Sequence, residues 1–292
     1  MSFFPSPRYM ALPLLLSMIC TCVPCTAKDT SQQDLEQVVA RAIRFLRTQG
    51  VAADGSYSRQ AGIGVTALAT TGLLRHGVKV DDPVVAKSLK HLESCIREDG
   101  GIYEEGTYFR NYETCLTVLC FQEANADGRY DQVIRKADAF VKGIQWGADE
   151  GSDESDPAYG GAGYGKHKRP DLSNTGFLVD ALRAAGNAED SEALQRALTF
   201  VSRCQNLETE HNTTPYAAKI QEGGFYYTVA AGGDSKAGKS ANGGLRSYGG
   251  MTYAGLKSMI YAGVKQDDPR VKAAVEWVRK LYDLSTNPGM GD

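Results

Sequence analysis

The stretch FLRTQGVAADGSY at residues 45–57 decides the fold, because its pattern returns along the chain. An aromatic and an aliphatic residue stand near the end of a predicted helix, and a glutamine follows. An acidic residue and glycine then form a turn that leads to an aromatic residue. Related phrases begin at His91-Leu92, Phe140-Val141, Phe200-Val201 and Trp277-Val278, with Cys95 in place of glutamine in one copy. A phrase that recurs at such intervals predicts a repeat architecture.

Between these phrases lies a second kind of segment, which is apolar almost all round and carries a threonine near its start. A helix that is apolar on every side is buried on every side. We expect four such helices, at residues 64–77, 111–124, 173–186 and 247–263.

The helices that carry the anchors have a single apolar stripe instead. In residues 34–49 this stripe holds Leu35, Val38, Val39, Ala42, Ile43 and Leu46. Asp82-Pro83 and Asp268-Pro269 have the pattern of an N-cap followed by proline at the first helical position. A helix with one apolar stripe covers a core and faces water on its other side. The alternation predicts two concentric layers, an all-α toroid, with an open solenoid as the competing architecture.

The repeated phrase resembles the QW-type repeat of squalene–hopene cyclases, oxidosqualene cyclases and protein prenyltransferase β subunits, over about residues 30–290. The resemblance implies an α/α toroid of helical hairpins with a site in its central cavity. Five outer and four inner helices are predicted here, fewer than such rings contain. The chain ends where a fifth inner helix would begin, so we expect a ring that is C-terminally incomplete.

The first 27 residues have the pattern of a secretory signal peptide. Arg8 precedes an apolar run from residue 10 to residue 23, and Cys25-Thr26-Ala27 offers small residues for cleavage. The run is short for a membrane span, although an N-terminal anchor is the alternative. We therefore expect export to the periplasm or the outside, no membrane span after cleavage, and one toroid domain over residues 28–292.

The charge and the cysteine content of the chain limit the ligands and partners that we expect. A formal net charge of −3 lacks the basic stripe that nucleic acid would require. Four cysteines follow the signal segment, Cys95, Cys115, Cys120 and Cys204, and none forms a CxxC pair. We expect buried thiols, with a Cys95–Cys204 disulfide as the alternative, and neither a metal nor a cofactor.

The catalytic signatures of the resembling enzymes are absent. Squalene–hopene cyclases protonate an alkene with an Asp-x-Asp-Asp sequence, and the similar stretch here is Asp171-Leu172-Ser173-Asn174-Thr175. A hydroxyl and an amide stand where that chemistry needs a carboxylic acid. The chain also has no Asp-x-Cys of the kind that helps prenyltransferases hold zinc, and no Gly-Cys-Gly-Glu-Gln thioester sequence. We expect neither squalene cyclisation nor zinc-dependent prenyl transfer.

The remaining candidates are polar or aromatic residues near the starts of the inner helices. Helix N-termini supply hydrogen-bond donors, and aromatic rims suit an apolar ligand or a carbohydrate. The alternative is that these residues only cap helices and fill the lumen. They are Tyr112, Glu113, Asp171, Asn174, Tyr248 and Tyr253.

Two classes of function remain open. The first is a non-catalytic toroid that binds an apolar, terpenoid-like molecule or a protein partner in or around its cavity. The second is an exported enzyme with other chemistry there, such as carbohydrate hydrolysis or elimination by carboxylates and tyrosines. Carbohydrate sites favour tryptophan on their rims, and the chain has only Trp146 and Trp277, which favours binding.

Overall fold

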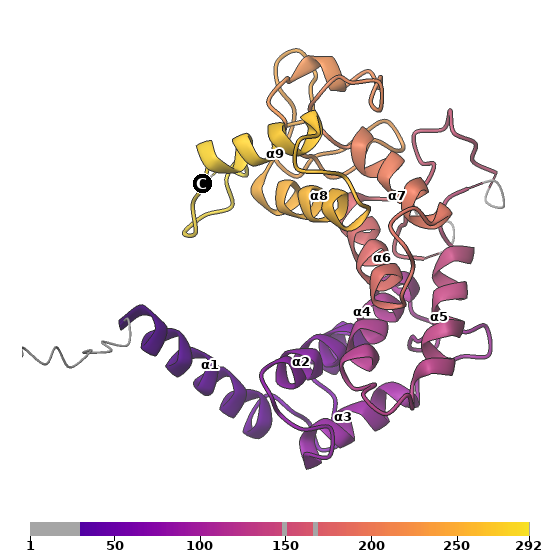
Figure 1. Ribbon diagram of the computed structural model, residues 1–292, viewed down its shortest axis with the longest axis vertical. Helices are drawn as coiled ribbons and strands as arrows, with labels where there is room; N and C mark the ends of the chain where they lie inside the picture. Colours follow the sequence, from indigo (N-terminus) through magenta and orange to yellow (C-terminus); the bar gives the residue numbers. More distant parts are fainter. Residues whose placement is uncertain (1–29, 148–150, 166–168, 292) are drawn as a thin grey trace, which may run out of the picture. The chain divides into compact units, whose positions relative to one another are not determined.

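The computed structural model describes residues 30–147, 151–165 and 169–291, so the predicted signal peptide lies outside the described residues. The chain divides into two compact units, Met1–Ala42 and Ile43–Asp292, and the first helix runs across their boundary. Nine α-helices make up nearly all the regular structure of the described ranges (Figure 1). They are α1 (Thr30–Thr48), α2 (Ile63–Arg75), α3 (Pro83–Glu93), α4 (Arg110–Glu123), α5 (Asp131–Gly143), α6 (Leu172–Ala184), α7 (Glu192–Arg203), α8 (Gly249–Tyr261) and α9 (Pro269–Lys280).

The second unit contains the two predicted kinds of helix in alternation. The predicted inner helices α2, α4, α6 and α8 pack side by side in that order. Each of them also packs against the outer helix that follows it, which is α3, α5, α7 or α9. The layered, all-α prediction is therefore confirmed, and each repeat consists of one inner and one outer helix.

The threonine near the start of every inner helix holds the turn of its own repeat. Its hydroxyl oxygen accepts a hydrogen bond from the backbone N–H of the residue two positions after the turn glycine, and all four hydroxyls lie on buried residues. Because a buried N–H needs an acceptor, the threonine explains why this residue type recurs. The pairs are Thr66 with Tyr57 (3.0 Å), Thr114 with Ile102 (3.0 Å), Thr175 with Ala162 (3.0 Å) and Thr252 with Phe225 (3.1 Å).

The turn glycine brings each repeat into backbone contact with the next outer helix. Gly160 has a φ of +79°, and a Cβ there would overlap the carbonyl of Arg196 on α7. Gly223 has a φ of +81°, and a Cβ there would collide with the backbone of Ala273 on α9. Only glycine combines this backbone conformation with so close an approach.

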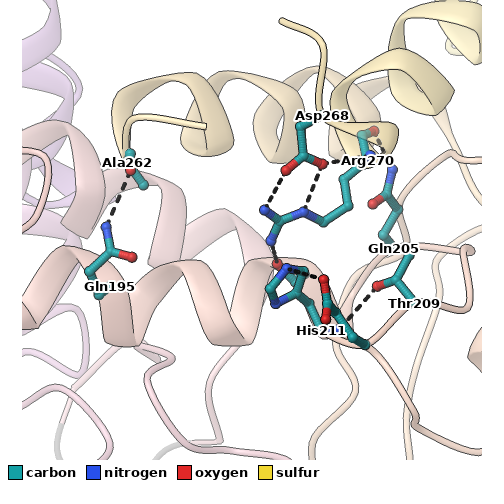
Figure 2. A network of polar contacts seen from close by, with 9 residues as sticks. Gln195, Gln205, Thr209, His211, Ala262, Asp268 and Arg270 are labelled. Atoms are coloured by element: carbon teal, nitrogen blue, oxygen red, sulfur yellow. Dashed lines mark hydrogen bonds and ion pairs between the residues drawn. The ribbon is translucent and has the colours of Figure 1, made fainter. Parts of the chain in front are cut away.

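The anchor glutamine ties consecutive repeats together. The Gln205 amide donates a 2.9 Å hydrogen bond to the carbonyl of Arg270 in the next outer helix (Figure 2). It donates a second, also of 2.9 Å, to the carbonyl of Gly223 in its own turn. Gln145 makes the same two bonds, to Gly160 and Ala193, each of 2.9 Å. The glutamine of the repeated phrase therefore links neighbouring repeats by hydrogen bonds.

The inner helices have more buried residues than the outer helices, except at one end of the inner row. Nine of the 14 residues of α4 and eight of the 13 of α6 are buried, against four of 11 in α3 and three of 13 in α5. The expectation that every inner helix is the more buried kind is wrong for α8, with five buried residues of 13 against six of 12 in α7. The reason is position, because α8 stands at the end of the row and leaves Ile260 52% exposed; at the other end, α2 leaves Leu68 47% exposed.

The structure also bears on the predicted helix caps, the alternative disulfide and the membrane span. Asp82 and Asp268 cap α3 and α9, accepting hydrogen bonds from the N–H groups of Val84 (3.0 Å) and Arg270 (2.8 Å). Cys95, Cys115, Cys120 and Cys204 are buried and free, so the alternative Cys95–Cys204 disulfide is absent. Among the described helices, none is long and apolar enough to cross a membrane.

Candidate functional site

A small aromatic cavity lies at the N-terminal ends of α4 and α6. Its volume is about 260 Å³. Two pairs of rings form most of its wall, Phe109 with Tyr164 and Tyr112 with Phe177, each pair edge to face with centroids 5.2 Å apart. We call this cavity the aromatic pocket; its lining residues are Ala61, Phe109, Tyr112, Tyr164, Ser173, Asn174 and Phe177. Larger cavities of about 600 and 710 Å³ are lined mainly by charged and polar side chains.

Asn174 is the buried polar residue of this wall, with 1% of its surface exposed. Its side-chain nitrogen donates to one oxygen of Asp171 at 2.9 Å, and its backbone N–H donates to the other, also at 2.9 Å. The carbonyl of Asn174 accepts from the amide of Asn111 at 3.3 Å. The side-chain oxygen of Asn174 has no hydrogen-bond partner among the described residues.

Asp171 is the N-cap of α6 and lies behind the pocket wall rather than in it. Burial raises the pKa of its carboxyl, and the hydrogen bonds from Asn174 and Tyr227 act in the opposite direction. A carboxylate that receives several hydrogen bonds is held in one orientation. Asp171 therefore fixes Asn174 and is itself not a lining residue.

Tyr227 connects Asp171 to the outer part of the wall. Its hydroxyl is hydrogen-bonded to the Asp171 carboxylate and to the Tyr164 hydroxyl, and burial, followed by the charge of Asp171, raises its pKa. The carboxylate thus positions Asn174 directly, and the Tyr227 hydroxyl lies between it and Tyr164.

Glu113 is adjacent to Tyr112 in sequence, but its side chain makes its contacts outside the aromatic pocket. Its carboxylate accepts a 3.0 Å hydrogen bond from the backbone N–H of Glu104 and lies against Gly62 at the start of α2, where a Cβ would collide with it. Burial is the main cause of its raised pKa. Glu113 is not among the residues that line the aromatic pocket, and its contacts secure the start of the neighbouring inner helix.

The two candidates from α8 and its N-cap also lie outside the pocket lining. Tyr248 is the buried N-cap of α8, and burial raises its pKa, with smaller contributions from Asp171 and Asp234. Tyr253 is 45% exposed on α8. Of the six predicted residues, the structure thus brings Tyr112 and Asn174 together in the wall, with Asp171 directly behind.

Sequence reasoning missed most of the aromatic wall. Phe109 and Tyr164 lie in or next to loops, so no periodicity marked them, and Tyr227 follows a repeat turn. Phe177 could have been found, because it stands three residues after Asn174 and therefore on the same side of α6. Ser173, which replaces a carboxylate of the cyclase sequence, lines the pocket. Nowhere in the described part of the chain do three His, Cys, Asp or Glu side chains form a group that could hold a metal ion.

Comparison with known proteins agrees with this fold. The family model of the squalene-hopene cyclase C-terminal domain matches residues 63–230, more than half of the chain. The type II terpene cyclase MstE from Scytonema, solved without ligand, aligns with a TM-score of 0.52 and 13% identity over 86% of this chain and 64% of that one. An MstE variant in complex with its substrate, geranylgeranyl dihydroxybenzoate, aligns with a TM-score of 0.51 and 13% identity over the same shares.

These likenesses to solved structures concern the fold, and the chain spans 64% of the length of MstE. No curated protein sequence matches the chain. The helical layers, the threonine-led inner helices and the family match lead to one conclusion: the chain belongs to the squalene-hopene cyclase C-terminal domain family.

Proposed function

We propose that this protein binds an apolar, terpenoid-like ligand in the aromatic pocket and does not cyclise it by the squalene–hopene cyclase reaction. The observation that carries the proposal is the position of Ser173. It lines an aromatic cavity, within the stretch that resembles the acid sequence of the cyclases. An aromatic wall beside a hydroxyl, where the cyclases have a proton donor, supports binding without that reaction.

The chemistry of the wall supports an apolar ligand. Five of the seven lining residues are alanine, phenylalanine or tyrosine, and none carries a formal charge at neutral pH. Pockets for small molecules are usually lined in this way, with a few polar groups that set orientation. Their volumes are roughly 300–1,000 Å³. At about 260 Å³ the aromatic pocket holds one end of a terpenoid rather than a whole one.

The absence of an acid in the wall argues against alkene protonation. Such a step needs a neutral carboxylic acid in reach of the double bond. Ser173 and Asn174 cannot supply that proton, and both oxygens of Asp171 already accept hydrogen bonds from Asn174. The same arrangement gives no support to carbohydrate hydrolysis, because neither Asp171 nor Glu113 lines the pocket.

The structural relative gives the ligand class a precedent. MstE is described as a terpene cyclase, and one of its structures contains a geranylgeranyl compound. Together with the proposed signal peptide at residues 1–27, this leads to an exported protein that takes up a terpenoid outside the cytoplasm. A protein partner is the other candidate occupant.

The test is a binding titration of the mature chain with geraniol and farnesol, followed by calorimetry. We expect saturable binding, and a loss of roughly tenfold or more for Phe177→Ala, which removes one ring from the wall. Tyr253→Ala, also an aromatic-to-alanine change but on the exposed side of α8, is the matched control and should bind as the wild type does. Absence of saturable binding, or equal losses in both variants, would overturn the proposal.

A further inference from the structure

A second cavity lies where the four inner helices end, and the last residue of each of them lines it. Its volume is about 710 Å³, inside the roughly 300–1,000 Å³ of most ligand sites. Three basic and three acidic side chains line it, so it favours no ion of a single sign. We call this cavity the charged pocket; these six residues are Arg75, Glu123, Asp180, Arg183, Glu189 and Lys257.

The charged pocket and the aromatic pocket share two helix faces. On α6, Phe177 lines the aromatic pocket and Asp180 lines the charged pocket. On α4, Tyr112 lines the first and Leu119 lines the second. Residues three or seven positions apart lie on one side of a helix, and three residues rise by only about 4.5 Å. The two cavities therefore follow one another along the inner layer, and an elongated ligand can contact both.

Two basic side chains of the charged pocket have hydrogen-bond donors to spare. The side chain of Arg75 is 57% exposed, and within the described residues its guanidinium donates only through Nε, at 2.7 Å to Glu123. Lys257 Nζ donates at 2.6 Å to Asp180. A guanidinium carries five N–H donors and an ammonium three, so both groups keep donors for a further acceptor. A carboxylate suits them best, because hydrogen bonds between charged groups are the strong ones.

Glu189 is the acid of the charged pocket whose carboxylate accepts no hydrogen bond from any described residue. Its oxygens lie 3.8 Å from the Arg183 Nη2 atom and 3.8 Å from the Lys265 Nζ atom, which is beyond hydrogen-bond distance. Arg183 instead donates to the Asn187 carbonyl at 2.7 Å. The negative ends of the inner helices also face this region, and they favour a cation. An ammonium group that donates to Glu189 therefore meets an open acceptor and a favourable field.

We propose that the charged pocket binds the zwitterionic, amino-acid head group of an amphipathic ligand whose apolar chain extends into the aromatic pocket. The carboxylate of the head group accepts hydrogen bonds from Arg75 and Lys257, and its ammonium group donates to Glu189. This inference rests on the proposed function, since it requires the aromatic pocket to hold an apolar chain. It adds the chemistry of the other end of the ligand.

Three forms of one compound provide the test, because they share the hydrocarbon and differ only in charge. At pH 6, S-farnesylcysteine carries a carboxylate and an ammonium group. Its N-acetyl derivative keeps only the carboxylate, and its methyl ester keeps only the ammonium group. By calorimetry at equal ionic strength, we expect the wild type to bind S-farnesylcysteine roughly tenfold more tightly than either derivative.

Two variants assign the two charges separately. Arg75→Gln should weaken binding of S-farnesylcysteine and of the N-acetyl derivative, and leave the methyl ester unchanged. Glu189→Gln should weaken S-farnesylcysteine and the methyl ester, and leave the N-acetyl derivative unchanged. Arg129→Gln is the control, since Arg129 is also an exposed, ion-paired arginine, with Asp127 at 2.6 Å, but does not line the pocket. A thermal melt establishes that each variant folds, and either pocket variant alone tests one of the two contacts.

The outcomes separate this inference from the proposed function. Equal affinities for the three compounds, with farnesol also bound, would overturn the inference and leave the proposed function standing. Failure of farnesol and of all three compounds to bind would overturn both. A preference for S-farnesylcysteine that persists in Arg75→Gln and Glu189→Gln would place the head group elsewhere and also refute the inference.

Discussion

Asp171 and Asn174 are joined by two hydrogen bonds of 2.9 Å that occupy both carboxylate oxygens of Asp171. The pair stands at the start of α6, in the stretch that resembles the acid sequence of squalene–hopene cyclases. The relationship determines the orientation of the Asn174 amide, which belongs to a residue in the wall of the aromatic pocket. The two bonds make Asp171 a positioning residue. A carboxylic acid that reacted with a ligand would have to give up these contacts.

Thr175→Val tests the role of the repeated threonine. The change removes a buried acceptor for the Ala162 N–H, which is bonded at 3.0 Å. Leaving that N–H unsatisfied should lower the free energy of unfolding by about 1–3 kcal/mol. Urea unfolding measures the change, with Thr199→Val as the control, because the Thr199 hydroxyl makes only an exposed 3.2 Å bond to the Gln195 carbonyl within α7. Equal effects of the two substitutions would contradict the proposed role.

Gly160→Ala separates close contact from backbone strain. Gly160 and Gly186 both have positive φ, +79° and +89°, but only Gly160 lies against the backbone of the next outer helix. Gly186→Ala should cost about 1–2 kcal/mol, the usual penalty for that backbone conformation. Gly160→Ala should cost clearly more and lower the melting temperature further, since α7 must move away. A smaller effect at Gly160 would mean that the repeats do not depend on this contact.

Glu113 makes stability depend on pH in a defined direction. Burial raises its folded-state pKa above the ordinary value of 4.5, so folding shifts the carboxyl toward its neutral form relative to the unfolded chain. Its contribution is fully present below the unfolded pKa and is lost as pH rises through the folded pKa. The stability of the wild type relative to Glu113→Gln should therefore fall as pH rises from below the ordinary pKa of 4.5 through the raised one. Urea unfolding of both proteins across that range measures it, and a rise would show the opposite sign of shift.

Cleavage after Ala27 tests the export proposal. Expression of the full chain in a secreting bacterial host should yield extracytoplasmic protein that begins at Lys28, because small residues precede that bond. Mass spectrometry of the intact protein and its N-terminal peptide gives the answer. If the exported chain still carries Arg8 and the apolar run, the result would favour an N-terminal membrane anchor over a cleaved signal peptide.

Much of the fold could be predicted because its causes are local. The apolar stripe of an outer helix, the Asp82-Pro83 cap and the threonine of an inner helix each depend on a few consecutive residues. The exception, α8, has the composition of an inner helix and the burial of an outer one. Its exposure depends on how many neighbours flank it, a property of the whole row that no local pattern contains.

For the site, the sequence alone determined that polar and aromatic residues gather at the starts of the inner helices, and that Ser173 and Asn174 replace carboxylates. Only the tertiary structure decided which of them meet. Successive helix residues point about 100° apart, so Tyr112 lines the pocket while its neighbour Glu113 lies against Gly62. Phe109 and Tyr164 come together from separate segments, because loop positions follow from the packing of α4 against α6 rather than from any periodicity.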